Sequence, residues 1–326
     1  MIQRSAAWSL GGIIVLSCGS ALAQQQDTYP SRLIRMIVPQ PAGGTTDVLG
    51  RFVSQKITEA TGQQAIVENR GGAGGNIGTE IVAKARPDGY TLLTVASSTL
   101  TINPSLFPKM PYDTLQDLAP ITTIAEVPNV LVAHPSLPVR NVKELIALAR
   151  AKPNQLNYGS SGSGQSSHLA MELFKAMAGV DIIHIPYKGG NQLVMDVLAG
   201  QILLMMNNIT TALPHIKAGK LRALGVTTLK RSPAMPELPA IDEAGLPGFE
   251  NSVWYGVLAP AGTPVPIINR LNSIVVKALN MPDMRERLSN QGAEPVGNTP
   301  DESAAQLRAD IAKWAKVIKA TGAKLD

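Results

Sequence analysis

A proline- and glycine-rich segment carries the residues best suited to binding chemistry. From Ile37 to Asp47 the sequence reads IVPQPAGGTTD, in which a strand pattern runs through a loop into a helical pattern. Free N–H groups and the positive end of the helix dipole attract an anion at a helix N-terminus, and glycines let the anion approach the backbone. Taken alone, the segment fits a plain strand-to-helix turn with Thr45, Thr46 or Asp47 as N-cap slightly better.

A second segment of the same design lies in the middle of the chain. From Tyr158 to His168 the sequence reads YGSSGSGQSSH, which follows a short strand pattern and opens a helical one. If the two loops face each other across a cleft, their Ser and Thr hydroxyls can donate to carboxylate oxygens, and water can bridge longer gaps. The pair together favours an anion-binding cleft over two unrelated turns.

Three other segments are less specific. The glycine-rich stretch from Asn69 to Gly78 has neither GxGxxG spacing nor a GK[ST] ending, so it is interpreted as a structural loop before a helix. The segment from Lys188 to Gly190 either places a cation and bare amides at the cleft or forms a turn with a solvated lysine. Met205 and Met206, beside Asn207 and Asn208, fit a strand end in the core best, although the two amides stand where a strand would emerge toward the cleft.

Enzymatic interpretations find little support in the motifs. The run from Gly159 to Gly162 reads GSSG, which misses the GxSxG spacing of a serine nucleophile. The four histidines show no metal-ligand spacing. We therefore predict no catalytic residue, metal site or cofactor. The enzymatic alternative is an exported hydrolase or transferase that uses Ser161 or His168, and it would need a base within hydrogen-bonding reach of the serine.

Composition limits the classes of partner. Of 326 residues, 44% are apolar and 16% are charged, a balance typical of globular proteins. The net charge is +5 and the pI is near 9.3, but Lys and Arg are scattered singly and aromatic residues make up only 4%. Because a nucleic-acid-binding surface combines clustered basic charge with stacking aromatics, no nucleic-acid partner is predicted. The mild positive charge fits the attraction of small anions better.

The N-terminus predicts export. Arg4 supplies positive charge, the stretch from Ala6 to Leu16 is largely apolar, and small residues end at Ala23, which together describe a secretory signal peptide over residues 1–23. The protein is therefore expected in the periplasm. Lipid anchoring at Cys18 is the alternative. Since Cys18 is the only cysteine, the cleaved chain would contain neither a disulfide nor a thiolate ligand.

Strand and helix patterns alternate along the rest of the chain. Predicted strands run from Ile34 to Val38, Ala65 to Glu68, Thr91 to Val95, Val130 to Ala133, Ile182 to Ile185, Ile202 to Met206, Ala223 to Thr227 and Tyr255 to Leu258. The clearest predicted helices run from Thr46 to Ala60, Asn141 to Ala151, Ser166 to Ala178, Asn191 to Ala199, Pro264 to Leu279 and Asp301 to Ala320. This alternation predicts an α/β fold with a mostly parallel sheet.

The length of the mature chain predicts two lobes. About 300 residues are too many for one comfortable core and suit two lobes of roughly 100 to 200 residues each. Two strand-like segments, from Pro120 to Pro135 and from Phe249 to Pro260, can carry the chain between them. The predicted domains are the signal peptide at 1–23, a discontinuous lobe 1 at 24–123 and 250–326, and lobe 2 at 124–249.

Several segments, in the same order, resemble the Bug-type substrate-binding proteins of tripartite tricarboxylate transporters. The similarity spans essentially the whole mature chain. It is carried by the segments Ile37 to Asp47, Glu68 to Gly78, Arg86 to Leu93, Tyr158 to Leu173 and Trp254 to Pro260. The resemblance implies a type II-like periplasmic-binding-protein fold, in which each lobe is a central sheet flanked by helices and the ligand cleft lies between the lobes.

The resemblance also implies a role. The protein would be a receptor that closes on a small organic acid, with the ligand carboxylate held against the first loop partly through ordered water, and would deliver it to membrane permease subunits. Closure would follow from tighter ligand binding to the closed form. Sensing through a sensor kinase, in place of transport, is an alternative.

The resemblance and the loop chemistry together give the predicted ligand-binding residues. In the first half of the chain they are Gln40, Ala42, Gly43, Gly44, Asp47, Ser97 and Ser98. In the second half they are Ser161, Gly162, Gln165, Ser166, Lys188, Gly189 and Asn207. Family members often have an aromatic residue in place of Gln40 and Ser or Thr in place of Gln165, which implies a more polar or differently shaped ligand. The stretch from Gln201 to Met206 lacks the acidic residue common in members, which disfavours an amino-acid ligand.

Overall fold

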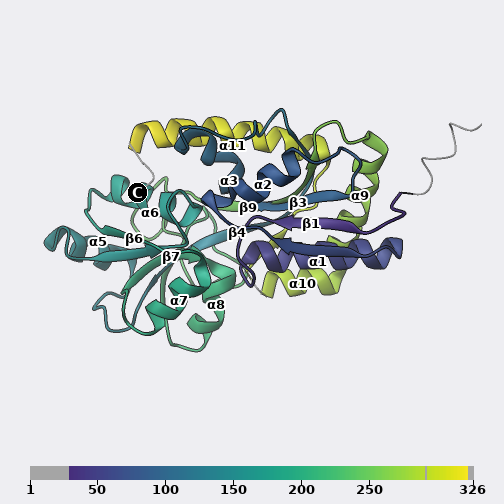
Figure 1. The fold of residues 1–326 in the computed structure, drawn as a ribbon. Coiled ribbons are helices and arrows are strands. Elements are labelled where there is room, and N and C mark those ends of the chain that lie inside the picture. Colours follow the sequence, from purple (N-terminus) through teal and green to yellow (C-terminus); the bar gives the residue numbers. More distant parts are fainter. Residues whose placement is uncertain (1–28, 291, 322–326) are drawn as a thin grey trace, which may run out of the picture.

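The computed structural model describes residues 29–290 and 292–321. The predicted signal peptide and the alternative lipid attachment at Cys18 lie outside the described residues. In the described part, two α/β lobes lie side by side, and long strands run from one into the other (Figure 1). The predicted fold class, a two-lobed α/β protein, is confirmed.

A ten-stranded mixed sheet runs through both lobes. Its strands are β1 (Ile34–Val38), β2 (Ala65–Asn69), β3 (Thr91–Ala96), β4 (Leu118–Ala133), β5 (Asn157–Ser160), β6 (Ile183–Pro186), β7 (Leu204–Asn208), β8 (Arg222–Val226), β9 (Ser252–Pro260) and β10 (Glu294–Pro295). The strand order is β2-β1-β3-β9-β4-β7-β5-β6, and both β8 and β10 pair with β4 off this path. Parallel pairing holds β1 to β2 and β3 in one lobe, and β5 to β6 and β7 in the other.

Strand β4 connects the lobes. It pairs antiparallel with β9 from Leu118 as far as Pro128, and then antiparallel with β7 from Asn129 onward. A single strand is therefore shared between the two halves of the sheet. Strand β9, which begins at Ser252, returns the chain to the first half.

Helices cover both faces of each half. They are α1 (Thr45–Thr61), α2 (Asn76–Ala83), α3 (Ser97–Thr101), α4 (Asn103–Leu106), α5 (Val142–Ala151), α6 (Ser166–Ala178), α7 (Gly190–Leu198), α8 (Ile209–Lys217), α9 (Val265–Leu279), α10 (Pro282–Asn290) and α11 (Pro300–Thr321), with a short 3₁₀ turn at Ala73–Gly75. In Figure 1, α1 and α10 lie on one side of the first half of the sheet, and α2, α3 and α11 on the other.

The two faces bury different side chains because residues alternate along a strand. In the second half of β4, Val130 and Val132 belong to the apolar cluster that includes α7 and α8, whereas Leu131 and Ala133 belong to the cluster that includes α5 and α6. All four side chains are fully buried. Each lobe is therefore a three-layer sandwich with the sheet in the middle.

Most of the predicted elements are present. Strand β1 and helix α6 have the predicted bounds, and α1, α5, α7, α9 and α11 begin and end within a residue of prediction. Helices α3, α4, α8 and α10 and strand β10 were not predicted, and the first half of β4 was predicted only as a strand-like segment from Pro120. Helix α8 contains Pro214, and β4 contains Pro120 and Pro128, which break the usual helix and strand patterns.

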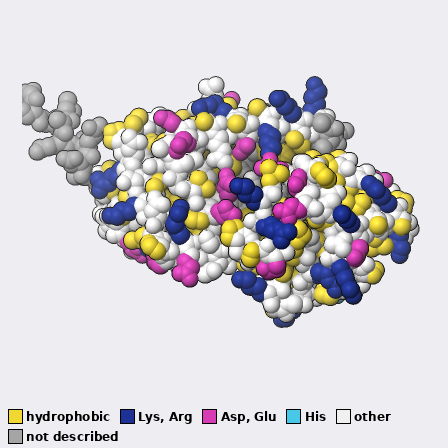
Figure 2. Space-filling model, turned by 180° about the vertical axis from the view of Figure 1, so that it is seen from behind, with side chains coloured by type: hydrophobic (Ala, Val, Ile, Leu, Met, Phe, Trp, Pro, Cys, Tyr) yellow, Lys and Arg dark blue, Asp and Glu magenta, His cyan; other side chains and the backbone are white. Residues whose placement is uncertain are grey.

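Charged side chains do not gather into a patch of one sign on the face in Figure 2, where basic and acidic groups are interspersed. Within residues 29–290 and 292–321, no helix is both long enough and apolar enough to cross a membrane.

Candidate functional site

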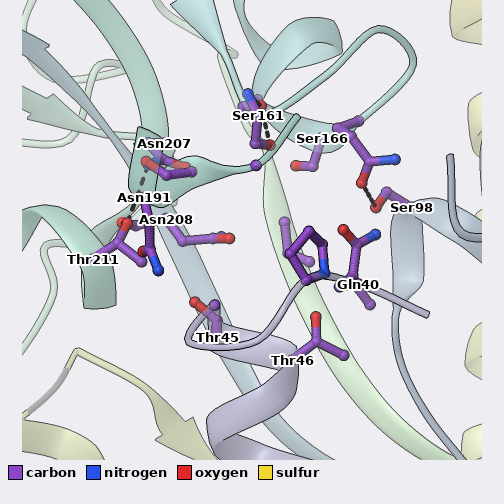
Figure 3. Close-up of a pocket in the computed structure, with 18 of the residues that line it drawn as sticks. Gln40, Thr45, Thr46, Ser98, Ser161, Ser166, Asn191, Asn207, Asn208 and Thr211 are labelled. Carbon is purple, nitrogen blue, oxygen red and sulfur yellow. Dashed lines mark hydrogen bonds between the residues drawn. The ribbon is translucent and has the colours of Figure 1, made fainter. Parts of the chain in front are cut away.

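A cavity of about 300 Å³ lies where the two lobes meet. One lobe contributes the loop before α1, the start of α3 and strand β9, and the other contributes the starts of α6, α7 and α8. Figure 3 shows Gln40 and Ser98 on one side of the cavity, Asn191 and Thr211 on the opposite side, and Thr45 below. The wall is rich in side-chain amides and hydroxyls.

Four helices begin at this cavity. The N-caps of α1, α6, α7 and α8 are Gly44, Gln165, Gly189 and Asn208, and all four line it. Among these four described helices, none has a side chain hydrogen-bonded to its own first turn as a cap. Since the first N–H groups of a helix lack partners within it and carry partial positive charge, the cavity is electrostatically suited to an anion.

The lining carries one charge. Lys188 is the charged residue among the described residues that line the cavity, and it is exposed. Backbone N–H groups and Lys188 therefore supply positive potential, while the remaining polar lining groups are neutral.

Asp47 holds the first loop in place from behind. Its buried carboxylate accepts hydrogen bonds from Gly43 N–H at 2.9 Å, Arg51 Nε at 3.0 Å and Asn69 Nδ2 at 2.9 Å. Burial alone would raise the pKa of the Asp47 carboxyl, but these hydrogen bonds and the charge of Arg51 hold it below its usual value. Gly43 completes the turn with a φ of +83°, a region that favours glycine.

The second loop contributes hydroxyls. Ser161 is fixed by Ser167, whose Oγ lies 2.9 Å from Ser161 N and 2.8 Å from Ser161 Oγ. Gln165 reaches the other lobe: its Oε1 accepts from Ser98 Oγ at 3.4 Å, and its Nε2 donates to Gly74 O at 3.3 Å. The Gln165 side chain therefore bridges the lobes.

On the opposite wall, Thr45 Oγ1 and Thr210 Oγ1 form a 2.6 Å hydrogen bond between α1 and α8, which also crosses from lobe to lobe. Tyr255, from β9, donates to Asn208 Oδ1 at 2.8 Å. Burial raises the pKa of the Tyr255 phenol, so its proton stays available for this hydrogen bond.

Ten of the fourteen predicted binding residues line the cavity. They are Gln40, Ala42, Gly44, Ser98, Ser161, Gln165, Ser166, Lys188, Gly189 and Asn207.

The other four lie behind the lining. Asp47 faces Arg51 and Asn69, as described above, and Gly43 lines a neighbouring cavity. Ser97 is buried, with its carbonyl accepting from Thr101 Oγ1. Gly162 donates its N–H to Ser160 Oγ. These four residues do not line the cavity, because their hydrogen bonds build the loops rather than face the space between them, and their part in ligand binding stays a prediction.

Other lining residues were absent from the predicted set. They include Thr45, Thr46, Asn191, Gln192, Asn208, Thr211, Val253 and Tyr255. Their local sequences carried a weak signal: Asn191 follows a Gly-Gly pair at a helix start, and Asn208 stands beside the predicted Asn207. Thr211 lies on α8, the helix obscured by Pro214.

The geometry around the candidate nucleophiles differs from that of a serine hydrolase. The described hydrogen-bond partner of the Ser161 hydroxyl is Ser167. The serine beside a histidine is Ser160, whose Oγ lies 2.6 Å from His184 Nε2, but Ser160 is fully buried and does not line the cavity. His168 stacks on His184 with ring centroids 4.1 Å apart, inside the lobe.

Two α/β lobes that share crossing strands, with helix N-termini converging on a polar cleft between them, define a ligand receptor of the periplasmic-binding-protein class. The chain belongs to the tripartite tricarboxylate transporter family of receptors, whose family pattern matches residues 49–323. The predicted resemblance to Bug-type receptors is thereby confirmed.

Curated relatives agree over nearly the full length. Protein BugT of Bordetella pertussis is 41% identical over 96% of this chain and 97% of its own. The UPF0065 protein in the tcbD-tcbE intergenic region of Pseudomonas sp. strain P51 is 40% identical over 95% of this chain and 92% of its own.

Solved structures match as well. Rpa4515 of R. palustris, solved with adipate, superposes with a TM-score of 0.88 at 40% identity, covering 91% of this chain and all 100% of that one. MatC (Rpa3494) of Rhodopseudomonas palustris, solved with bound malate, gives a TM-score of 0.83 at 32% identity, covering 89% and 100%. The fold class and the receptor family are therefore both shown.

Proposed function

We propose that this protein is a periplasmic receptor that binds a small organic acid between its lobes and delivers it to the permease subunits of a tripartite tricarboxylate transporter, without a chemical step. The observation that carries the proposal is the convergence of four uncapped helix N-termini on one cavity. The adipate and malate in two similar structures support a carboxylate as the anion.

The lining chemistry supports the same ligand class. No Asp or Glu is among the described residues that line the cavity, so nothing there repels a carboxylate, and Lys188 adds a positive charge at the exposed edge. A carboxylate oxygen accepts hydrogen bonds and donates none, and it is matched by N–H groups and hydroxyls. We place the carboxylate against Gly44 and Thr46 of the first loop, with Ser161 and Ser166 opposite.

Closure of the lobes completes the proposal. The hydrogen bonds Thr45–Thr210 and Ser98–Gln165 join residues of different lobes, so they form only when the cleft is shut. A ligand that touches both walls stabilises that form by its higher affinity for it. The proposed moving bodies are residues 24–123 with 250–326, and residues 124–249.

Export belongs to the same proposal. Cleavage after Ala23 would release the receptor into the periplasm, with lipid attachment at Cys18 as the alternative route. The mass of the N-terminal peptide from exported protein decides between the two. The proposed function includes no nucleic-acid partner.

Calorimetric titration of the exported protein with mono-, di- and tricarboxylates, and with neutral sugars as controls, tests the proposal. A ligand at about 100 times its dissociation constant should raise the free energy of unfolding by about 2.7 kcal/mol. Gly44→Phe, which places a ring in the cavity, should abolish binding. Ala60→Phe, on the exposed far end of the same helix, should leave binding intact. Binding of sugars alone, or retention of acid binding in Gly44→Phe, would contradict the proposal.

A further inference from the structure

Asn207 presents an unused hydrogen-bond acceptor at the wall of the cleft. The residue ends β7, lines the cavity and is only 2% exposed. Its amide nitrogen Nδ2 donates to Thr211 Oγ1 at 3.1 Å and lies 3.4 Å from Gly190 O. No residue in the described ranges donates to its Oδ1. This oxygen is not among the fully buried atoms that lack a partner, so it is open to the cavity and can accept from a donor outside the chain.

The orientation of this amide follows from its neighbours. The Thr211 hydroxyl donates its hydrogen to Asn208 O at 2.9 Å, so it can only accept a hydrogen bond from Asn207. The carbonyl of Gly190 can also only accept. Rotating the Asn207 amide by half a turn would therefore set its oxygen against two acceptors. Nitrogen must face Thr211 and Gly190, which leaves Oδ1 as the free atom.

The adjacent residues on this wall do not offer an equivalent acceptor. Both polar atoms of the Asn208 amide already have protein partners, because its Oδ1 accepts from Tyr255 and its Nδ2 donates to Asn129 Oδ1 at 3.1 Å. Asn191 is exposed and its amide is free to turn, so it can meet either a donor or an acceptor. Asn207 therefore determines that this part of the cleft offers an acceptor to the ligand.

We propose that the ligand is a hydroxycarboxylic acid whose hydroxyl donates to Asn207 Oδ1. This inference rests on the proposed function, which supplies the carboxylate, and it adds the group that the opposite end of the ligand must carry. The second carboxylate of an unsubstituted dicarboxylate would place an acceptor oxygen against Asn207 Oδ1, which is itself an acceptor. An ammonium donor fits less well, since no carboxylate lines the cavity to balance its charge.

Matched acids that differ by one hydroxyl test the inference. Calorimetric titration compares D- and L-malate with succinate, citrate with tricarballylate, and lactate with propionate. In at least one pair, the hydroxy acid should bind at least about tenfold more tightly, the ratio expected for one well-placed hydrogen bond to a buried acceptor. If acids bind but every pair shows equal affinities, or the unsubstituted acid binds more tightly, the inference is overturned.

Two variants locate the effect. Asn207→Leu keeps a similar volume without the acceptor and should reduce the hydroxyl preference, the ratio of the two affinities, to about one. Asn191→Leu, on the same wall, should keep the preference. If Asn207→Leu does not fold, Thr211→Val provides the second test, because it frees the amide to turn and should also weaken the preference. An undiminished preference in these variants would overturn the assignment to Asn207. Failure of every acid to bind wild type would instead contradict the proposed function.

Discussion

Asn129 and Asn251 are joined by a 2.9 Å hydrogen bond, from Nδ2 to Oδ1, where two chain segments pass between the lobes. Asn129 is the first residue of β4 to pair with β7, and Asn251 directly precedes β9. Thr227, just after β8, joins them: its Oγ1 accepts from Asn129 N and donates to Asn251 O. The two crossing segments and the end of β8 are therefore tied together at a single buried point.

This buried point also touches the binding cavity. Asn129 Nδ2 donates to Ser166 Oγ at 2.9 Å, and Asn129 Oδ1 accepts from Asn208. Ser166 and Asn208 both line the cavity. The angle between the lobes and the position of two lining residues consequently depend on the same carboxamide, which couples ligand contact to closure.

Asn129→Ala tests this coupling. The change leaves Asn208 Nδ2 without its acceptor and removes one hydrogen bond each from Ser166 Oγ and Asn251 Oδ1, which still bond to each other, so we expect the free energy of unfolding to fall by about 1–3 kcal/mol. Acid affinity should fall as well, because Ser166 and Asn208 lose their orientation. Chemical denaturation and calorimetric titration measure the two effects. Asn280→Ala, at an exposed position, should change neither. A stable variant with unchanged affinity would show that the network is not coupled to binding.

Asp47 gives the first loop a defined response to acid. Because its pKa is lowered in the folded protein, its charge contributes stability that is present above the unfolded value of about 3.9 and is lost as pH falls through the lower folded value. Acid affinity measured from pH 7 down to pH 3 should therefore hold down to about pH 4 and then decline. Asn at this position can still accept from Gly43 but lacks the charge that attracts Arg51, so Asp47→Asn should weaken affinity at neutral pH. Its decline with acid should be shallower than in wild type, and parallel curves would contradict the role given to Asp47.

Adjacent glycines of the same loop should respond differently to the same substitution. Gly43 has a φ of +83°, and an added Cβ would lie 3.0 Å from Asn191 Nδ2. Gly44 has a φ of −81°, and its Cβ would lie 3.8 Å from Pro41 O. Gly43→Ala should therefore cost roughly 1–2 kcal/mol of unfolding free energy, the penalty for left-handed backbone in a residue with a Cβ. Gly44→Ala should cost less than half of that. Equal losses in denaturant titrations would show that backbone strain is not the cause.

How far the fold follows from the sequence depends on whether the determining interactions are local. Strand β1 and helix α6 were predicted at their observed bounds, since period-2 and period-3.6 patterns are local properties of a segment. The first half of β4 was predicted only as a strand-like segment without a place in the sheet, because Pro120, Thr122 and Pro128 weaken the strand pattern. Their place in the sheet is fixed by pairing with β9, more than a hundred residues further along the chain.

The same division holds for the site. Gly44 and Ser161 were recognised because glycine- and serine-rich helix starts have a characteristic local sequence. Tyr255 reaches the cavity only because β9 runs between β3 and β4, and no local pattern contains that arrangement. The Asp47 carboxylate turns away from the cavity because it accepts from Arg51 and Asn69, and these side chains reach it only in the folded loop.

Helix α11 bridges the lobes on the side opposite α1 and α10 (Figure 1), and Trp314 belongs to its apolar contact with both lobes. The indole is 7% exposed and packs in a cluster with Ile102, beside α3 in one lobe, and Leu169 of α6 in the other. Because an indole that touches both lobes restrains their separation, Trp314→Ala should favour the open form as well as leave a cavity. We expect unfolding free energy to fall by about 3–5 kcal/mol, the usual cost of truncating a buried tryptophan.

Small-angle scattering of the ligand-free protein distinguishes these two effects. Trp314→Ala should increase the radius of gyration relative to wild type, and a saturating acid should reduce the difference, because the ligand favours the closed form independently of α11. Lys316→Ala, two residues away and exposed, should leave both the radius and the stability unchanged. If Trp314→Ala is destabilised but keeps the wild-type radius in the absence of ligand, the contact stabilises the fold without restraining the lobes, and closure must depend on the crossing strands and the cleft alone.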